Sequence, residues 1–243
     1  ATESEFAPFE FKSLVNGKDT LVGADIELAK AIGEKLGVKV EFSVMSFDNV
    51  LANVQSGKAD IAIAGISVTD ERKKVYDFSD SYYTSENGVI VKKDKVNDYT
   101  STDSLAKQTV GTQKGSVQET VAKKQIPKAS VVSLTSNGEM INELKSGQLQ
   151  AVVLEKAIAE GYIAQNDDLT LANFNLKSDG TDAYAVATRK GSDDLLKEIN
   201  AVIKETKDSG KFDQWLKEAS NKVSKFKTSE HLKRVNFRCF HQQ

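Results

Sequence analysis

The sequence has almost no histidine or cysteine. His231, Cys239 and His241 are the only examples, and all three lie within the last thirteen residues. The first 230 residues therefore contain no imidazole and no thiol. Ser/His/Asp triads, Cys/His dyads, zinc sites of the Cys/His type and CxxC redox pairs all need one of these groups, so none of them fits in this part of the chain. We expect its chemistry to rest on carboxylates, amides, hydroxyls, guanidinium groups and aromatic rings, without a cofactor.

The sequence also lacks an excess of one charge and any long apolar run. Its 33 basic and 35 acidic residues leave a net charge of −2, which gives no basis for binding nucleic acid. No run of about 18 apolar residues is present, so we expect no membrane span. We also find no charged segment followed by an apolar one, and we interpret the chain as lacking its signal peptide, as a mature exported protein does.

What the chain does contain is an alternation of helices and strands. Helices are predicted over Asp25–Leu36, Phe47–Ser56, Ser116–Lys124, Ser136–Gly147, Asp193–Ser209 and Phe212–Ala219. Strands are predicted over Val38–Met45, Ala59–Ala64, Val89–Lys92, Gln108–Thr112, Leu149–Leu154 and Asp182–Thr188. At Ser116, the spacing to Glu119 predicts a capping box. The alternation predicts an α/β fold with mainly parallel sheets and right-handed crossovers.

One internal similarity suggests two lobes of like construction. The segment 54–63, VQSGKADIAI, is echoed ninety positions later by 144–153, LKSGQLQAVV. Each reads as a helix end, a Ser-Gly stop and a buried strand. Chance recurrence of such turns in an α/β chain is the alternative. Because ligands bind beyond the carboxyl ends of strands in open α/β sheets, two lobes facing each other would form a binding cleft.

The two ends of the chain depart from this pattern. Thr228–Gln243 holds both histidines, the cysteine and a net charge of +2, which leaves −4 for the rest. We interpret it as a foreign or disordered tail rather than a site, with a native docking segment as the alternative. At the other end, Ala1-Thr2 runs at once into a loop-like segment, which predicts a shortened opening strand.

The segment Ala64–Lys74 has the highest density of functional groups. A buried strand ends at Gly65, where the backbone can approach a ligand closely. Ser67 offers a hydroxyl, Thr69 is suited to begin a helix, and Arg72 supplies a planar guanidinium. Such a guanidinium pairs with a carboxylate through two parallel hydrogen bonds. By composition alone, the alternative is a solvated arginine on a surface helix.

Four stretches of the sequence resemble one family, the amino-acid-binding proteins of polar amino-acid ABC transporters in the periplasmic binding protein superfamily (bacterial solute-binding protein family 3). They are FAPFEF at 6–11, LVGADIELA at 21–29, DIAIAGISVTDERKK at 60–74 continuing into YDFSDSYY at 76–83, and VGTQKGS at 110–116. The third stretch is the most specific. The resemblance extends from Ala1 to about Ala219.

The resemblance implies a type II two-lobed fold whose lobes are mainly parallel sheets flanked by helices. Residues 1–91 with 187–225 would form the first lobe, 92–186 the second, and 226–243 a tail outside the family pattern. The hinge would be the two strands Gly88–Lys92 and Asp182–Thr188. The family is extracytoplasmic, either periplasmic or lipid-anchored at the outer face of the membrane, and its members deliver ligand to a membrane permease.

The resemblance also implies a role for each site residue. Arg72 would bind the ligand α-carboxylate, helped by Ser67 and by the backbone amides of Ser116 and Val117 at a helix start, which favours an anion. The Gly65 carbonyl and Glu155 would hold the α-ammonium group, although the family commonly has Asp at the latter position. The remaining pocket positions are Phe6 and Phe47 around the ligand side chain, Glu3 at its distal end, and Gln113 from the second lobe.

These residues predict a binding protein rather than an enzyme. Glu3 between two aromatic faces suits a cationic side chain, so we expect arginine or lysine, with glutamine or histidine as the alternative. A dehydratase of the cyclohexadienyl type on the same fold, with Glu3 or Glu155 as general acid, is a second hypothesis. A sensory ectodomain is a third. We expect a monomer whose partners are a small-molecule ligand, the amino acid, and a membrane permease of an ABC transporter. We expect it to bind no nucleic acid.

Overall fold

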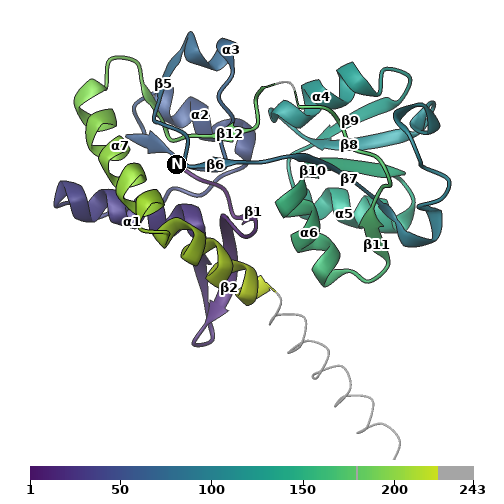
Figure 1. Ribbon diagram of the computed structural model, residues 1–243, viewed down its shortest axis with the longest axis horizontal. Helices are drawn as coiled ribbons and strands as arrows, with labels where there is room; N and C mark the ends of the chain where they lie inside the picture. Colours follow the sequence, from purple (N-terminus) through teal and green to yellow (C-terminus); the bar gives the residue numbers. More distant parts are fainter. Residues whose placement is uncertain (179, 224–243) are drawn as a thin grey trace, which may run out of the picture.

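The computed structural model describes residues 1–178 and 180–223, which form two lobes side by side (Figure 1). The tail predicted over 226–243 lies outside the described residues. Among the described helices, none is long and apolar enough to cross a membrane. The elements are, in chain order, β1 (Glu5–Phe6), β2 (Glu10–Val15), β3 (Lys18–Val22), α1 (Ala24–Leu36), α2 (Phe47–Gln55), β4 (Ile61–Ala62), α3 (Asp70–Lys73), β5 (Tyr76–Phe78), β6 (Tyr83–Thr84), β7 (Asn87–Lys92), the 3₁₀ turns η1 (Lys93–Lys95) and η2 (Thr102–Leu105), β8 (Thr109–Gln113), α4 (Val117–Gln125), β9 (Ser130–Leu134), α5 (Asn137–Ser146), β10 (Ala151–Glu155), α6 (Lys156–Gln165), β11 (Leu169–Leu171), β12 (Ala183–Tyr184), β13 (Ala187–Arg189) and α7 (Asp193–Asp208).

The first lobe is built from both ends of the chain. It contains the antiparallel sheet β1-β2-β3, the antiparallel sheet β4-β13-β5, and the helices α1, α2 and α7. Helix α1 packs its apolar stripe, including Leu28 and Ile32, in the same buried cluster as Ile199 and Ile203 of α7. Residues 211–223 are also helical. The period of these apolar positions is helical, so each helix buries one face.

The strand pairing of the first lobe differs from the mainly parallel sheet that we expected. Val38–Met45 is not a strand, although Val40 and Phe42 are partly buried against the core while Val38 and Val44 are exposed. Only a single parallel bridge joins Val44 to Thr2, with backbone bonds of 3.0 Å from Thr2 N to Ser43 O and from Met45 N to Thr2 O. The parallel alignment is therefore present, but its ladder is too short to form a strand.

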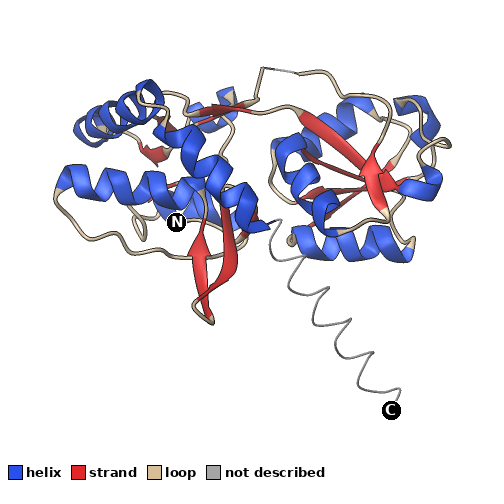
Figure 2. Ribbon diagram, turned by 60° about the horizontal axis from the view of Figure 1, so that its bottom comes forward, coloured by secondary structure: helices blue, strands red, loops and turns tan. Residues whose placement is uncertain are grey.

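The second lobe has one five-stranded sheet in the order β11-β7-β10-β8-β9. Strands β8, β9 and β10 run parallel, while β7 and β11 are antiparallel to their neighbours. Helices α4, α5 and α6 surround this sheet, as Figure 2 shows. All five residues of β10 are buried, as the apolar run before Glu155 predicts.

The two lobes are joined by a short pair of strands, β6 and β12, which pair antiparallel through Tyr83↔Tyr184 and Thr84↔Ala183. The predicted hinge strand Gly88–Lys92 is different: it lies wholly within the second sheet as part of β7. The second lobe therefore begins before residue 92. The predicted strand Asp182–Thr188 is divided, because Ala183 pairs with β6 whereas Ala187 pairs with β4 and β5 of the first lobe.

The predicted capping box at Ser116 does not form. Ser116 is the N-cap of α4, but its hydroxyl donates to the Gln113 carbonyl at 2.7 Å and makes no cap bond. Glu119 accepts from Gly115 N at 3.2 Å instead of from the N-cap residue. This arrangement leaves the first amides of α4 without a side-chain cap and ties the helix start to the strand before it.

Candidate ligand-binding site

The ten predicted site residues come together where the two lobes meet. In the first lobe they lie at the chain start, at the start of α2, between β4 and α3, and within α3. In the second lobe they lie at the β8–α4 and β10–α6 junctions. The first-lobe members are Glu3, Phe6, Phe47, Gly65, Ser67 and Arg72, and the second-lobe members are Gln113, Ser116, Val117 and Glu155. Strand ends and helix starts thus supply the site, as in other open α/β sheets.

Arg72 connects the two lobes. Its Nη1 donates to the Ser67 carbonyl at 2.7 Å, and its Nη2 donates to the Gly115 carbonyl across the cleft at 3.0 Å. The guanidinium carbon lies 5.8 Å from the centre of the Phe47 ring, within the range of a cation–π contact. Burial lowers the pKa of Arg72 to about 10, and the charge of Glu155 opposes this shift. The side chain is therefore a fixed cation at neutral pH.

A cavity of about 520 Å³ lies beside Arg72. Gly115, Ser116 and Val117 line it from the start of α4, and Thr69 lines it from the first lobe. The positive end of the α4 dipole and its uncapped amides therefore lie near the guanidinium. Together they form an anion-binding corner. Ser67, which is 3% exposed, contributes its backbone carbonyl to hold Arg72 in place.

Glu3 is a buried carboxylate that meets the second lobe through Gln113. The Gln113 amide Nε2 donates to both carboxylate oxygens of Glu3, at 3.2 and 3.1 Å. Burial raises the pKa of Glu3 to about 8, an effect that the bond from Gln113 opposes and the charge of Glu155 increases. A carboxylate in this position favours a cation close by, because a nearby positive charge compensates for its lost hydration.

Glu155 is a second buried carboxylate, at the end of β10 where α6 begins. Burial raises its pKa to about 7, while hydrogen bonds, among them one from Gln118, and the charge of Arg72 lower it. Gln118 is fixed in turn, because its Nε2 donates to Asn87 Oδ1 at 3.0 Å. The charge of Glu155 also makes the ionisation of Glu3 more costly, because two like charges then lie close together.

The backbone at Gly65 is held in a conformation that requires glycine. Its φ is +55°, and a Cβ at this position would lie 2.4 Å from Cε1 of the Phe6 ring. Its amide donates to Asp25 Oδ2 at 3.0 Å. Phe6 itself is 3% exposed and contacts Phe9 and Tyr184, with ring centres 5.9 and 6.3 Å apart.

The Phe6 and Phe47 rings have different neighbours. Phe47 lies against Arg72, next to the anion-binding corner, whereas Phe6 lies against Gly65 and the hinge residue Tyr184. Both rings border the site, but each is fixed by a different neighbour.

Sequence reasoning missed a buried acidic group behind Gly65. Asp25 is completely buried, and its Oδ2 also accepts a 2.7 Å bond from the Tyr82 hydroxyl. Glu10, also completely buried, interacts with Asp25; burial and this neighbour raise the pKa of Glu10 well above its ordinary range, so Glu10 stays protonated. Burial raises the pKa of Asp25 to about 6. Both acids lie in stretches that carry the family resemblance, Glu10 in 6–11 and Asp25 in 21–29, and this was the sequence signal for them. We interpreted Asp25 only as the first residue of a helix.

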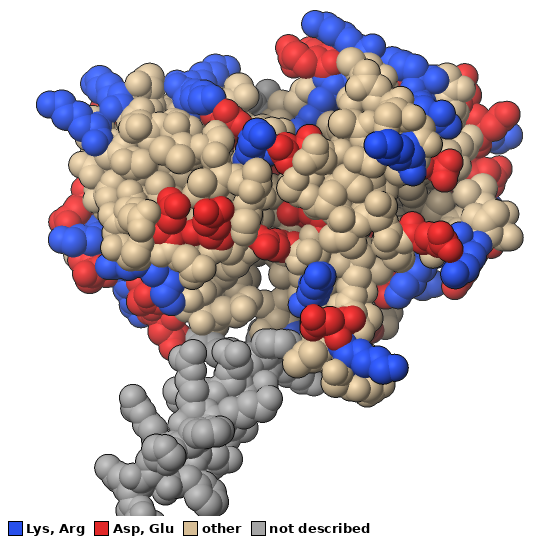
Figure 3. All heavy atoms as spheres, turned by 180° about the vertical axis from the view of Figure 1, so that it is seen from behind, with Lys and Arg blue, Asp and Glu red and all other residues tan. Residues whose placement is uncertain are grey.

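The lobes are in contact across the cleft at several points besides Arg72 and Glu3. Lys114 Nζ lies 3.0 Å from Asp48 Oδ2, and the Glu5 carboxylate accepts from Ser136 Oγ at 2.7 Å and from Gly138 N at 3.0 Å. Seen from behind, acidic side chains lie along the boundary between the lobes (Figure 3). These contacts describe a closed arrangement in which the site residues of both lobes are close together.

Comparison with known proteins identifies the family of the chain. The model of the bacterial extracellular solute-binding proteins, family 3, matches residues 1–221. The chain belongs to this family. It is 34% identical to the arginine-binding extracellular protein ArtP of Bacillus subtilis, over 88% of this chain and 82% of that protein. It is also 33% identical to the glutamine-binding protein GlnH of the same organism, over 81% of this chain and 73% of that protein.

A solved structure gives the same result for the fold. The amino acid ABC transporter substrate-binding protein AbpA of Streptococcus pneumoniae, bound to L-arginine, is 50% identical to this chain. The match covers 91% of this chain and 93% of that chain, with a TM-score of 0.89. The type II solute-binding fold is therefore the fold of this family member, with mixed rather than mainly parallel sheets.

Proposed function

We propose that the chain binds a basic L-amino acid, arginine or lysine, between its lobes. The observation that carries this proposal is the charge of the site: two buried carboxylates, Glu3 and Glu155, are combined with one guanidinium, Arg72. A basic amino acid carries two cations and one anion, so it supplies the opposite charge at each of these positions. The cost of burying an unpaired charge favours such a complement.

The geometry supports one role for each group. Arg72 and the α4 amides of Ser116 and Val117 hold the α-carboxylate, and the neighbouring Ser67 positions Arg72. The Gly65 carbonyl and Glu155 hold the α-ammonium group. Glu3, positioned by Gln113, pairs with the cationic end of the ligand side chain, and Phe6 and Phe47 border its path. The L-arginine bound to AbpA supports this assignment.

The same reasoning extends to the role of the protein in transport. As members of the family do, the chain delivers its ligand to the permease of an ABC transporter, as an extracytoplasmic monomer, either free or held by an N-terminal lipid. Closure follows if the ligand contacts both lobes, because it then binds the closed form more tightly than the open form. The contacts from Arg72 and Gln113 across the cleft support this coupling.

A same-fold dehydratase is the second candidate, favoured by one observation. Burial raises the pKa of Glu3 to about 8 and that of Glu155 to about 7, so each retains protons near neutral pH as a general acid must. A turnover assay on prephenate and arogenate tests it. Detectable dehydration would replace the binding-protein proposal, and we expect none.

A thermal-shift screen against all the common amino acids tests the ligand. At about 100 times its dissociation constant, a ligand adds roughly 2.7 kcal/mol of stability, so arginine or lysine should give the largest shifts. If neutral or acidic amino acids raise the melting temperature while arginine and lysine do not, the ligand assignment is wrong.

A matched variant separates the side-chain contact from the rest of the site. Glu3→Gln keeps the size of the side chain and removes its charge, so we expect weaker arginine binding and a relative gain for glutamine. Glu5→Gln changes a nearby carboxylate that faces the other lobe, and it should leave the order of ligand preference unchanged. An unaltered preference in Glu3→Gln would remove Glu3 from the side-chain pocket.

A further inference from the structure

Glu5 joins the two lobes at a place separate from the ligand site. It lies on β1 of the first lobe, and its carboxylate Oε2 accepts from Ser136 Oγ at 2.7 Å and from the Gly138 amide at 3.0 Å. Both donors belong to the first turn of α5 in the second lobe. Ser136 is also the N-cap of that helix, since its Oγ accepts from Glu139 N at 3.1 Å. The carboxylate therefore occupies the positive end of a ten-residue helix.

The backbone of Glu5 makes a second connection to the same lobe. Its carbonyl accepts from the Tyr162 hydroxyl of α6 at 3.1 Å and from Asn137 Nδ2 at 3.5 Å. Burial, together with the charge of Glu5, raises the pKa of Tyr162, which keeps this phenol a donor. One residue of the first lobe thus receives four hydrogen bonds from two helices of the second.

These contacts involve none of the ten predicted site residues, although the charge of Glu5 contributes to the raised pKa of Glu3. Along β1 the side chains alternate, so that Phe6 points into the core while Glu5 is exposed. Glu5 borders a separate cavity of about 270 Å³, whose lining residues include Gly138, Gly161 and Tyr162 and none of the ten predicted site residues. An interaction between lobes that exists only when they meet stabilises the closed form, whatever the ligand.

We propose that Glu5 and the start of α5 form a latch that stabilises the closed form and sets how long the ligand stays bound. Glu5 is a positioning residue in this role, since it acts through the lobes and not on the ligand. The inference rests on the proposed function, because it requires ligand to be released by opening. A weaker latch raises the dissociation rate by the same factor for each ligand that closes the lobes.

The Glu5→Gln variant tests the latch by stopped-flow kinetics on the full chain. Glutamine keeps the shape of the side chain but loses the charge that the helix start favours. We expect arginine to dissociate about three- to tenfold faster, the size of effect of one typical hydrogen bond, with an unchanged association rate. The factor should be the same for lysine. Tyr162→Phe, which removes the donor to the Glu5 carbonyl, should increase the dissociation rate independently.

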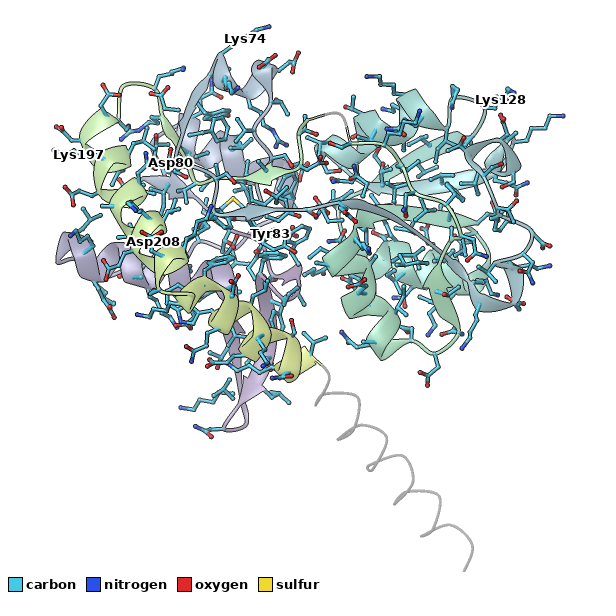
Figure 4. The ribbon with its side chains drawn as sticks, in the orientation of Figure 1. Lys74, Asp80, Tyr83, Lys128, Lys197 and Asp208 are labelled. Carbon is cyan, nitrogen blue, oxygen red and sulfur yellow. The ribbon has the colours of Figure 1, made fainter. Side chains whose placement is uncertain are left out.

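Controls separate the latch from general destabilisation. Glu139→Gln removes another carboxylate from the first turn of α5, one that makes no hydrogen bond or ion pair across the cleft among the described residues, so it should leave the dissociation rate unchanged. Lys128 and Lys197 are exposed at the outer ends of the second and first lobes (Figure 4). Dyes on Lys128→Cys and Lys197→Cys, with Cys239→Ser, report closure by energy transfer. In labelled Glu5→Gln, the rate of lobe opening seen by energy transfer should increase by the same factor as the rate of ligand dissociation.

The outcomes distinguish this inference from the proposed function. If Glu5→Gln releases arginine at the wild-type rate, the latch is wrong while amino-acid binding stands. A factor that differs between arginine and lysine also overturns it, because Glu5 would then contact the ligand side chain. If the wild-type protein binds neither amino acid, the proposed function fails and the latch fails with it.

Discussion

At the scale of single residues, the site depends on side chains whose geometry is not interchangeable. Arg72 uses its two terminal nitrogens in different directions, toward Ser67 in its own lobe and toward Gly115 in the other. A lysine ammonium group is a compact charge that cannot reproduce this planar arrangement. The position therefore requires the shape of the guanidinium as well as its charge.

This requirement predicts the result of Arg72→Lys. The charge is retained, but the paired geometry toward a carboxylate is lost, so we expect affinity for arginine to fall by about one to two orders of magnitude. Arg72→Ala should abolish measurable binding of every α-amino acid. Isothermal titration calorimetry measures both.

The matched control is Arg189→Lys, since Arg189 is an exposed arginine on β13. It should bind as the wild type does. Wild-type affinity in both Arg72 variants would exclude Arg72 from carboxylate binding.

At the scale of elements, the turn after β4 is fixed from both sides. Gly65 adopts φ +55°, the Phe6 ring lies on one side of it, and the Asp25 carboxylate holds its amide. The strand end thus acquires a rigid geometry from a ring and a buried acid that come from other parts of the lobe.

Gly65→Ala tests this rigidity. A Cβ would lie 2.4 Å from the Phe6 ring, so we expect a loss of stability of about 1–3 kcal/mol from overpacking, added to about 1 kcal/mol of backbone strain. Binding should weaken as well, because the ring and the turn must move. Urea unfolding and calorimetry measure the two effects.

Gly17→Ala is the matched control for backbone strain alone. Gly17 has φ +77° but no atom within 4 Å of a Cβ at this position. It should lose only the smaller, conformational part. Equal losses in the two variants would mean that the contact with Phe6 carries no energetic weight.

The sequence predicted elements well where local pattern determines them. Helices α1, α2, α4, α5 and α7 lie within a few residues of their expected bounds, because an apolar stripe and a stop residue such as Gly37 are local signals. The buried strand β10 was predicted from its unbroken apolar run. These features need no knowledge of the rest of the chain.

Features set by distant partners were not predictable. Val38–Met45 has a strand-like pattern, but among the described residues it pairs only through a single bridge from Val44 to Thr2. The division of Asp182–Thr188 depends on which strands lie beside it, and the capping box at Ser116 is replaced because the hydroxyl bonds back to Gln113. At the site, Arg72, Ser116 and Val117 line one cavity, whereas the contacts of Asp25 with Gly65 and Tyr82 link positions 40 and 57 residues apart.

At the scale of the whole molecule, the two lobes enclose acidic groups that the fold disfavours in their charged forms. Burial raises the pKa of Asp25 to about 6, of Glu155 to about 7 and of Glu3 to about 8. By contrast, hydrogen bonds and nearby lysines lower the pKa values of Asp48, Asp77 and Glu119. That second group loses its stabilising effect only in acid, below the ordinary carboxyl range.

The raised pKa values predict that the ligand-free protein becomes less stable as pH rises from 5 to 8. In this window the folded state binds more protons than the unfolded state, whose carboxyls titrate near 4, so the free energy of unfolding falls with pH. A basic ligand reverses the effect, because its cations stabilise the ionised carboxylates. Arginine should therefore raise the melting temperature by more at pH 8 than at pH 6.

Melting curves at pH 5, 6, 7 and 8, with and without arginine, measure both trends. Glutamine supplies the α-ammonium group but no second cation, so its stabilising effect should depend less on pH than that of arginine. In Glu3→Gln without ligand, the melting temperature should fall less between pH 7 and 8 than in the wild type, because the pKa of Glu3 is about 8. A ligand-free stability that rises from pH 5 to 8 would mean that these carboxyls are ionised in the folded protein without a ligand. Their charges would then be compensated by the closed lobes themselves, and the site would have no need of a cationic ligand.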